Sequence, residues 1–72
     1  MRTLEQTLRD AREKSRDGKP RFVVEDTEHD PGNPFSQFTI VKEGYLDQYD
    51  GYYLHAEYFE GKRTETEAGT IR

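Results

Sequence analysis

The chain contains no cysteine, and no stretch of it is apolar for even six residues in a row. Without cysteine there is no disulfide framework, no thiolate ligand for a metal and no cysteine nucleophile. A transmembrane helix needs ~20 apolar residues and a signal peptide also needs an apolar segment, so the sequence predicts neither. We therefore expect a cytoplasmic protein that does not enter the membrane.

Large apolar residues are also scarce. Leu, Ile, Val and Phe together account for 13 of the 72 residues, just below the ~20% at which disorder becomes a serious alternative. Five tyrosines and regularly spaced apolar positions argue against full disorder. The length fits one small domain over residues 1–72, with a thin core.

Charge divides the chain into three parts. Residues 1–21 carry net +3, residues 22–60 carry net −8 with Lys42 as their single basic side chain, and residues 61–72 carry net +1. Lys and Arg supply most non-specific affinity for nucleic-acid phosphates, so the acidic middle disfavours direct nucleic-acid binding. An acidic surface that only keeps the protein in solution is the simpler alternative to a functional one.

Residues 3–17 are predicted to form an amphipathic helix. Its apolar positions recur at helical spacing on one stripe: Leu4, Leu8 and Ala11. Thr3 and Gln6 have the spacing of a capping box, and Gly18 is well placed to end the helix. Because the apolar stripe is narrow, this helix needs a partner surface.

The rest of the chain predicts an antiparallel sheet. Strands are expected at about 21–25, 35–48, 52–60 and 63–71, with an acidic surface loop over 26–34. A frayed tail is the alternative for residues 63–71. The expected architecture is α+β, with an N-terminal amphipathic helix packed on one face of a three- to four-stranded antiparallel β-meander.

The second and third strands are predicted to form a hairpin. Residues 49–51, Tyr-Asp-Gly, suit a three-residue turn, which opposes Leu46 to Leu54 and Lys42 to Tyr58. A two-residue Asp-Gly turn is the alternative, and it shifts every pair by one residue.

In the first register, the helix covers one face of the sheet and leaves the other face to solvent. We expect this second face to bind a partner through seven residues: Glu43, Tyr45, Asp47, Tyr53, His55, Glu57 and Phe59. Tyrosine supplies a large contact area at low entropic cost. The opposed pair Glu43 and Glu57 costs stability, and this cost makes sense if the surface meets a basic partner. The alternative is that the aromatic residues form a second minor core under the 26–34 loop or in a homodimer.

The acidic loop does not match a specific metal site. Asp26, Glu28 and Asp30 alternate like the first ligands of a calcium loop, but Pro31 stands where that loop requires glycine. Two histidines without cysteine are too few for zinc. We expect His29 in this loop to be solvated.

Catalytic motifs are missing as well. Neither of the two serines has a histidine close in sequence, and no glycine-rich phosphate loop is present. A chain this short rarely builds a deep pocket. We expect a non-enzymatic protein without metal or cofactor.

Two segments in the C-terminal half form a recognisable pattern. The first is Gly44-x-Leu46-x-x-Tyr49-Asp50-x-Tyr52-Tyr53-Leu54, and the second is Ala68-Gly69-x-Ile71-Arg72. Together they resemble the two signature segments of Sm-like RNA-binding proteins. The resemblance implies an N-terminal helix before a bent antiparallel sheet, assembly into a ring, and RNA binding. Tyr53 stands where that family has an asparagine.

The sequence favours a small non-enzymatic protein-binding module or inhibitor that contacts a basic surface of another protein through its acidic, Tyr-rich sheet face. Rows of carboxylates would also allow it to mimic nucleic acid. Two alternatives stay open: the Sm-like RNA-binding ring, and a self-associating structural protein that forms a homodimer through the aromatic face or a strand edge.

Overall fold

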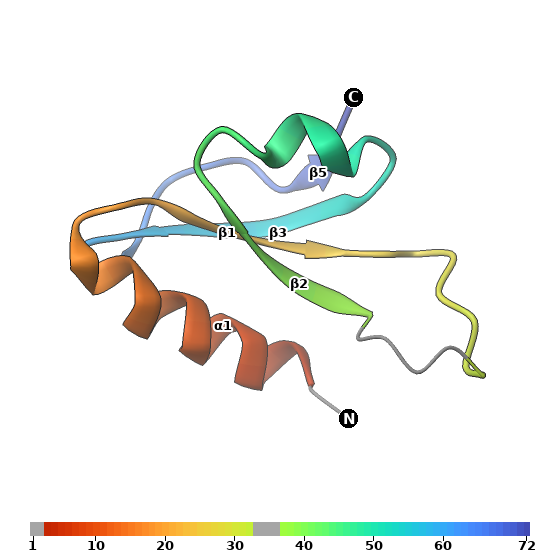
Figure 1. Cartoon of the computed structure of the whole chain (residues 1–72), viewed down its shortest axis with the longest axis horizontal. Coiled ribbons are helices and arrows are strands. Elements are labelled where there is room, and N and C mark those ends of the chain that lie inside the picture. The colour runs from red at the N-terminus through yellow and green to blue at the C-terminus, as the bar shows by residue number, and fades with distance from the viewer. Residues whose placement is uncertain (1–2, 33–36) are drawn as a thin grey trace.

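The computed structural model describes residues 3–32 and 37–72, and over these residues it has one α-helix, two short 3-10 helices and five strands (Figure 1). The helical elements are α1 (Leu4–Lys14), η1 (Ser15–Asp17) and η2 (Leu46–Tyr49). The strands are β1 (Arg21–Glu25), β2 (Phe38–Lys42), β3 (Tyr53–Phe59), β4 (Lys62–Arg63) and β5 (Gly69–Thr70). One N-terminal helix packed on an antiparallel open sheet confirms the expected α+β fold. In the described part of the chain, no helix is both long and apolar enough to cross a membrane.

The N-terminal helix forms where the sequence predicts it. The Thr3 hydroxyl accepts a hydrogen bond from the N–H of Gln6 at 3.2 Å, and the Gln6 side-chain oxygen accepts one from the N–H of Thr3 at 2.9 Å. This is the expected capping box. The helix continues into η1 and ends at Gly18, whose φ of 86° lies in the left-handed region. Thr7 and Ala11 are buried against the sheet.

The end of the helical segment is tied to the turn between β3 and β4. Ser15 is fully buried, and its Oγ accepts a hydrogen bond from the N–H of Gly61 at 2.9 Å. The same hydroxyl donates to the Arg12 carbonyl at 2.7 Å, and Arg12 Nε donates to the Gly61 carbonyl at 2.8 Å. These bonds hold the helix against a turn 46 residues further along the chain.

The start of β1 carries an ion pair between a buried arginine and an exposed aspartate. Arg21 is buried, and its Nη2 donates to Asp17 Oδ2 at 2.7 Å. Burial raises the pKa of Asp17, but the hydrogen bonds from Arg21 and from the N–H of Lys19 outweigh this effect and hold the pKa below its usual value.

The strand order differs from a hairpin between residues 35–48 and 52–60. The sheet runs β2-β1-β3-β4, and β5 also pairs with β3. Lys42 and Tyr58, expected to oppose each other, both pair with Arg21 of β1, which lies between their strands. The predicted hairpin is therefore wrong at either turn length, and β2 and β3 run parallel to each other on the two sides of β1.

The composition of β1 explains its central position. Val23 and Val24 are consecutive and both fully buried, so they point to opposite faces of the sheet, and each face needs a cover. A strand that is apolar on both faces belongs inside a sheet and not at its edge. Strands that are neighbours in sequence usually pair, and this tendency favoured the hairpin.

The second strand is shorter than the expected span 35–48. β2 ends at Lys42, while residues 35 and 36 lie outside the described residues. The N–H of Tyr45 donates to the Lys42 carbonyl at 3.2 Å, and Gly44 has a φ of 88°, so the chain turns directly after β2. Residues 43–52, here called the crossover segment, then pass over the sheet from β2 to β3 (Figure 1).

Both faces of the sheet are covered, one by α1 and the other by the crossover segment. The core on the helix side consists of Ala11, Val23, Ala56 and Tyr58, with Leu4, Leu8 and Ile40 packed against them. The core on the crossover side consists of Val24, Val41 and Leu54, with Phe22, Leu46, Tyr49, Tyr52 and Ile71 packed against them. Figure 1 shows α1 and η2 on opposite sides of the strands. The expected open second face is therefore wrong.

A β-bulge in β3 changes which residues share a face. Val23 pairs with Ala56 and Val24 pairs with Leu54, so His55 is the extra residue between the two pairs. Leu54 consequently belongs to the crossover-side core, although strict alternation placed it with Ala56 and Tyr58 under the helix.

The C-terminal residues form two short strands in place of one strand over 63–71. β4 pairs with the end of β3, and β5 pairs with its start. Two hydrogen bonds extend the β5 pairing: Gly51 N–H donates to the Ile71 carbonyl at 2.8 Å, and Ile71 N–H donates to the Tyr52 carbonyl at 2.8 Å.

We expect the substitution Ser15→Ala to lower the free energy of unfolding by about 1–3 kcal/mol, because it leaves the N–H of Gly61 without its buried acceptor. Urea unfolding followed by circular dichroism measures this change. The exposed Lys14→Ala serves as the control and should change stability by less than about 0.5 kcal/mol. Equal effects of the two substitutions would contradict the role given to Ser15.

Candidate functional site

The crossover segment presents three of the seven predicted partner-binding residues to solvent. Glu43, Tyr45 and Asp47 are exposed, and Tyr45 keeps 53% of its surface accessible. We call these three residues the crossover surface. Sequence reasoning placed them on a strand, whereas the structure places them in the turn after β2 and in η2.

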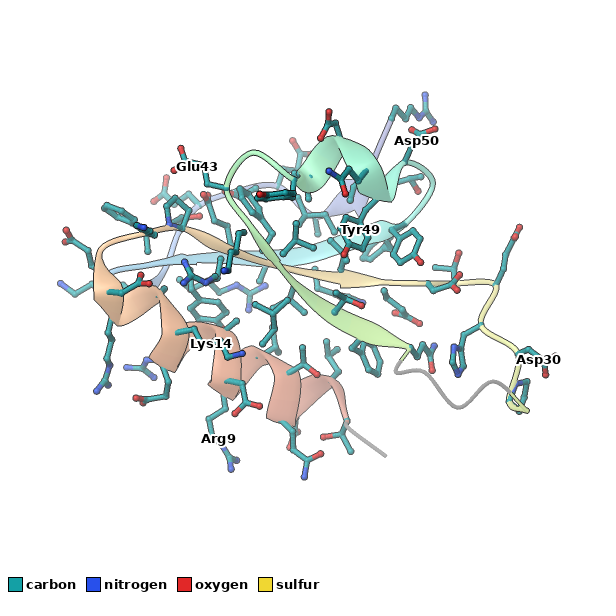
Figure 2. The ribbon with its side chains drawn as sticks, viewed as in Figure 1. Arg9, Lys14, Asp30, Glu43, Tyr49 and Asp50 are labelled. Carbon is teal, nitrogen blue, oxygen red and sulfur yellow. The ribbon has the colours of Figure 1, made fainter. Side chains whose placement is uncertain are left out.

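The geometry of η2 directs the side chain of Asp47 outward. Leu46 and Tyr49 are three residues apart in a 3-10 helix, so they lie above one another, and both pack on the crossover-side core. Figure 2 shows Tyr49 between η2 and the sheet. Asp47, next to Leu46 in the same turn, faces solvent.

A groove of about 260 Å³ lies beside the crossover surface. It is formed between β2 and η2 and is lined by Ile40, Val41, Lys42, Tyr45, Gln48 and Tyr49. Small-molecule sites usually occupy ~300–1,000 Å³, so this groove suits a single side chain better than a cofactor. Sequence reasoning missed it, because the groove depends on the chain turning back after β2.

The crossover segment is acidic, while the helical layer is balanced in charge. Residues 43–52 contain Glu43, Asp47 and Asp50 and no Lys or Arg, whereas residues 4–17 contain four basic and four acidic side chains. Figure 2 shows Glu43 and Asp50 on one side of the sheet and Arg9 and Lys14 on the other. Within residues 43–52 the three carboxylates are therefore not balanced by a basic side chain of the same segment, and Arg72, which follows Ile71, is the basic residue next to its end at Gly51.

Tyr53 and His55 lie elsewhere, at the end of the sheet and on the helix-side face. His55 Nε2 is 2.7 Å from Glu25 Oε1, and Gln37 Nε2 donates to Glu25 Oε2 at 2.6 Å. The His55 ring lies between two aromatic rings, with centroid distances of 4.8 Å to Tyr53 and 6.1 Å to Phe38.

This cluster links the ends of three strands. Both carboxylate oxygens of Glu25 are engaged, and the side chains of His55 and Glu25 are only 21% and 22% exposed. The arrangement therefore serves to hold β1, β2 and β3 together and leaves little surface for a partner. The sequence contained no indication of the contact between His55 and Glu25, because it depends on the bulge that brings His55 to the face of the sheet on which Glu25 lies.

Glu57 and Phe59 lie near β4. Glu57 Oε1 accepts hydrogen bonds from Thr64 Oγ1 at 2.8 Å and from Thr66 Oγ1 at 2.5 Å. The expected opposition of Glu43 and Glu57 is wrong, because Glu57 pairs with Phe22 of β1. Phe59 is 40% exposed.

The described part of the acidic loop uses two of its carboxylates to form turns; residues 33 and 34 lie outside it. Asp26 Oδ1 accepts a hydrogen bond from the N–H of Glu28 at 3.1 Å, and Asp30 Oδ1 accepts one from the N–H of Gly32 at 2.9 Å. Within residues 3–32 and 37–72, no three His, Cys, Asp or Glu side chains are grouped so that they could hold a metal ion.

The two segments that resemble Sm-like proteins lie side by side. Tyr53 pairs with Thr70, and Leu54 pairs with Gly69. Comparison with known proteins found no matching family model, no matching curated protein and no matching solved structure.

We expect Glu25→Ala to lower the free energy of unfolding by about 1–3 kcal/mol, since it leaves the side chains of His55 and Gln37 without their shared acceptor. Urea unfolding measures the effect, and the double variant with His55→Ala should destabilise by less than the sum of the single variants. Glu28→Ala, in the exposed loop, should have little effect. Additive effects of Glu25→Ala and His55→Ala would contradict the coupling.

Proposed function

We propose that this chain is a non-enzymatic protein-binding module that contacts a basic region of another protein through the crossover surface. The observation that carries the proposal is Tyr45, an aromatic side chain 53% exposed beside a groove and flanked in sequence by Glu43 and Asp47. Tyrosine is enriched at the energetic centres of protein interfaces. Carboxylates around it favour a partner of positive charge and raise the rate of association.

This proposal narrows the contact predicted from sequence. Tyr53, His55 and Glu57 are engaged within the domain, and Phe59 pairs with Lys62 of β4 outside the crossover segment. The proposed contact therefore consists of Glu43, Tyr45 and Asp47. The residues of the crossover segment are well suited to this role because Leu46 and Tyr49 anchor it to the core from beneath. A contact surface that is held in place loses little conformational entropy on binding.

The proposal predicts that the immobilised chain captures a basic protein from an extract of the cells that produce it, and that capture weakens as salt is raised. Tyr45→Ala and Asp47→Lys should each reduce the amount captured by about tenfold, the effect expected of a residue at an energetic centre. Quantitative mass spectrometry of the eluates measures this.

Glu13→Lys is the matched control, because it makes the same change in charge at an exposed position on the helix side. It should leave capture unchanged. If the captured protein is retained equally by Tyr45→Ala, Asp47→Lys and the wild type, or if capture is insensitive to salt, the proposed contact surface is wrong.

A further inference from the structure

In the part of the chain that the structure describes, the outer side of β2 is an open edge of the sheet, and at five residues it is longer than the edges of the two-residue strands β4 and β5. β2 stands at one end of the strand order, and no strand within residues 3–32 and 37–72 pairs with its outer side. At the other end, β3 is covered by β4 and β5. Figure 1 shows β2 crossing in front of β1 before the chain turns into η2. An open edge offers backbone hydrogen-bonding groups to another chain.

The backbone groups that point outward can be assigned from the ladder. Asp26 N–H donates to the Gln37 carbonyl at 2.9 Å, so this pair belongs to the hydrogen-bonded kind. The two kinds of pair alternate along an antiparallel ladder, so Ile40 and Lys42 belong to the other kind and direct their backbone groups away from β1. Ile40 thus presents both an N–H and a C=O at the edge, and Lys42 presents an N–H.

The groove follows this same edge. Its lining includes the consecutive residues Ile40, Val41 and Lys42, whose side chains alternate between the two faces, so the groove extends along the strand and not over one face alone. Tyr45 and Tyr49 form its other wall. An extended chain lying along β2 would therefore place one side chain in the groove while its backbone meets that of Ile40.

We propose that β2 binds an extended basic segment of the partner protein as an additional antiparallel strand; this inference rests on the proposed function and names the form of its partner. The segment carries a basic residue two positions before an apolar residue. The apolar side chain enters the groove beside Val41, and the basic side chain lies near Glu43. The recognition combines main-chain hydrogen bonds with one pocket and one charge contact.

The order of these two residues follows from the antiparallel direction. Positions 41 and 43 are two residues apart, and the added chain runs the opposite way, so its residue near Glu43 precedes its residue near Val41. The residue that follows the apolar one then faces Ile40 and exchanges both backbone hydrogen bonds with it.

Charge favours this occupant over a second copy of the chain. A second copy has the same net charge of −4 and the same acidic crossover segment. A basic segment instead meets Glu43 and Asp47, both exposed on the crossover side, while Lys42 belongs to the helix-side face together with Arg21.

The test uses three fluorescent, end-capped peptides and measures their binding by anisotropy. The first contains Thr-Arg-Ser-Leu-Thr-Ser, the second has Arg and Leu exchanged, and the third carries an N-methyl group on the Thr that follows Leu. The first peptide should bind, and the other two should bind about tenfold more weakly. The second peptide loses the groove contact and the charge contact, and the third loses a backbone hydrogen bond.

A pair of protein variants tests the same edge from the other side. Lys42→Pro removes the outward N–H of this residue without removing a bond to β1, whereas Lys42→Ala keeps the N–H. Lys42→Pro should bind the first peptide about tenfold more weakly than Lys42→Ala does, because the two variants both lack the lysine side chain and differ in the backbone N–H. Urea unfolding confirms that both variants are folded.

The outcomes separate this inference from the proposed function. Equal binding of the normal and N-methylated peptides overturns strand addition, and it leaves the proposed function intact if capture still depends on Tyr45 and Asp47. Failure of every peptide to bind, with capture intact, also overturns strand addition. A dimer in sedimentation that Lys42→Pro converts to a monomer would assign the edge to a second copy and overturn the proposal.

Discussion

Two consecutive valines with no access to solvent determine how this small domain is built. Val23 and Val24 point to opposite faces of β1, and both are fully buried. A chain with only 13 Leu, Ile, Val and Phe residues can satisfy this demand only by placing β1 inside the sheet and covering it from two sides. The helix supplies one cover, and the crossover segment between β2 and β3 supplies the other.

The second cover also creates the candidate binding surface. While Leu46 and Tyr49 of the crossover segment pack on the core, Glu43, Tyr45 and Asp47 of the same segment face solvent. The same turn opens a groove next to the free edge of β2. Core formation and the proposed recognition therefore depend on the same ten residues.

Features that depend on contacts between residues close in sequence could be predicted, and features that depend on distant contacts could not. The helix, its capping box and its end at Gly18 depend on contacts within a few residues, and these were predicted correctly. The location of β1 and β3 was also predicted well from β-branched and aromatic residues. The pairing of the strands was not predicted. The sequence allows Lys42 to pair directly with Tyr58, as a hairpin requires, and it equally allows both residues to pair with Arg21 of a strand between them, as the structure shows.

The single bulge at His55 changed which residues of β3 share a face. It separates Leu54 from Ala56, and it moves His55 onto the face of Glu25. A bulge in a strand of polar and aromatic residues cannot be recognised from the sequence, because it interrupts the alternation of side chains at one position only. The seven residues expected on one surface lie in three places, because the chain turns after β2, because β1 lies between β2 and β3, and because β3 has this bulge.

The amino-acid sequence by itself determined the α+β class, the helix and its ends, and the concentration of negative charge in residues 22–60. These properties depend on local spacing and composition. Only the tertiary structure decided that β1 is central, that the crossover segment covers the second face, and that no strand among residues 3–32 and 37–72 pairs with the outer side of β2. Those choices depend on which arrangement buries both valines at once, and a comparison of whole folds is needed to find it.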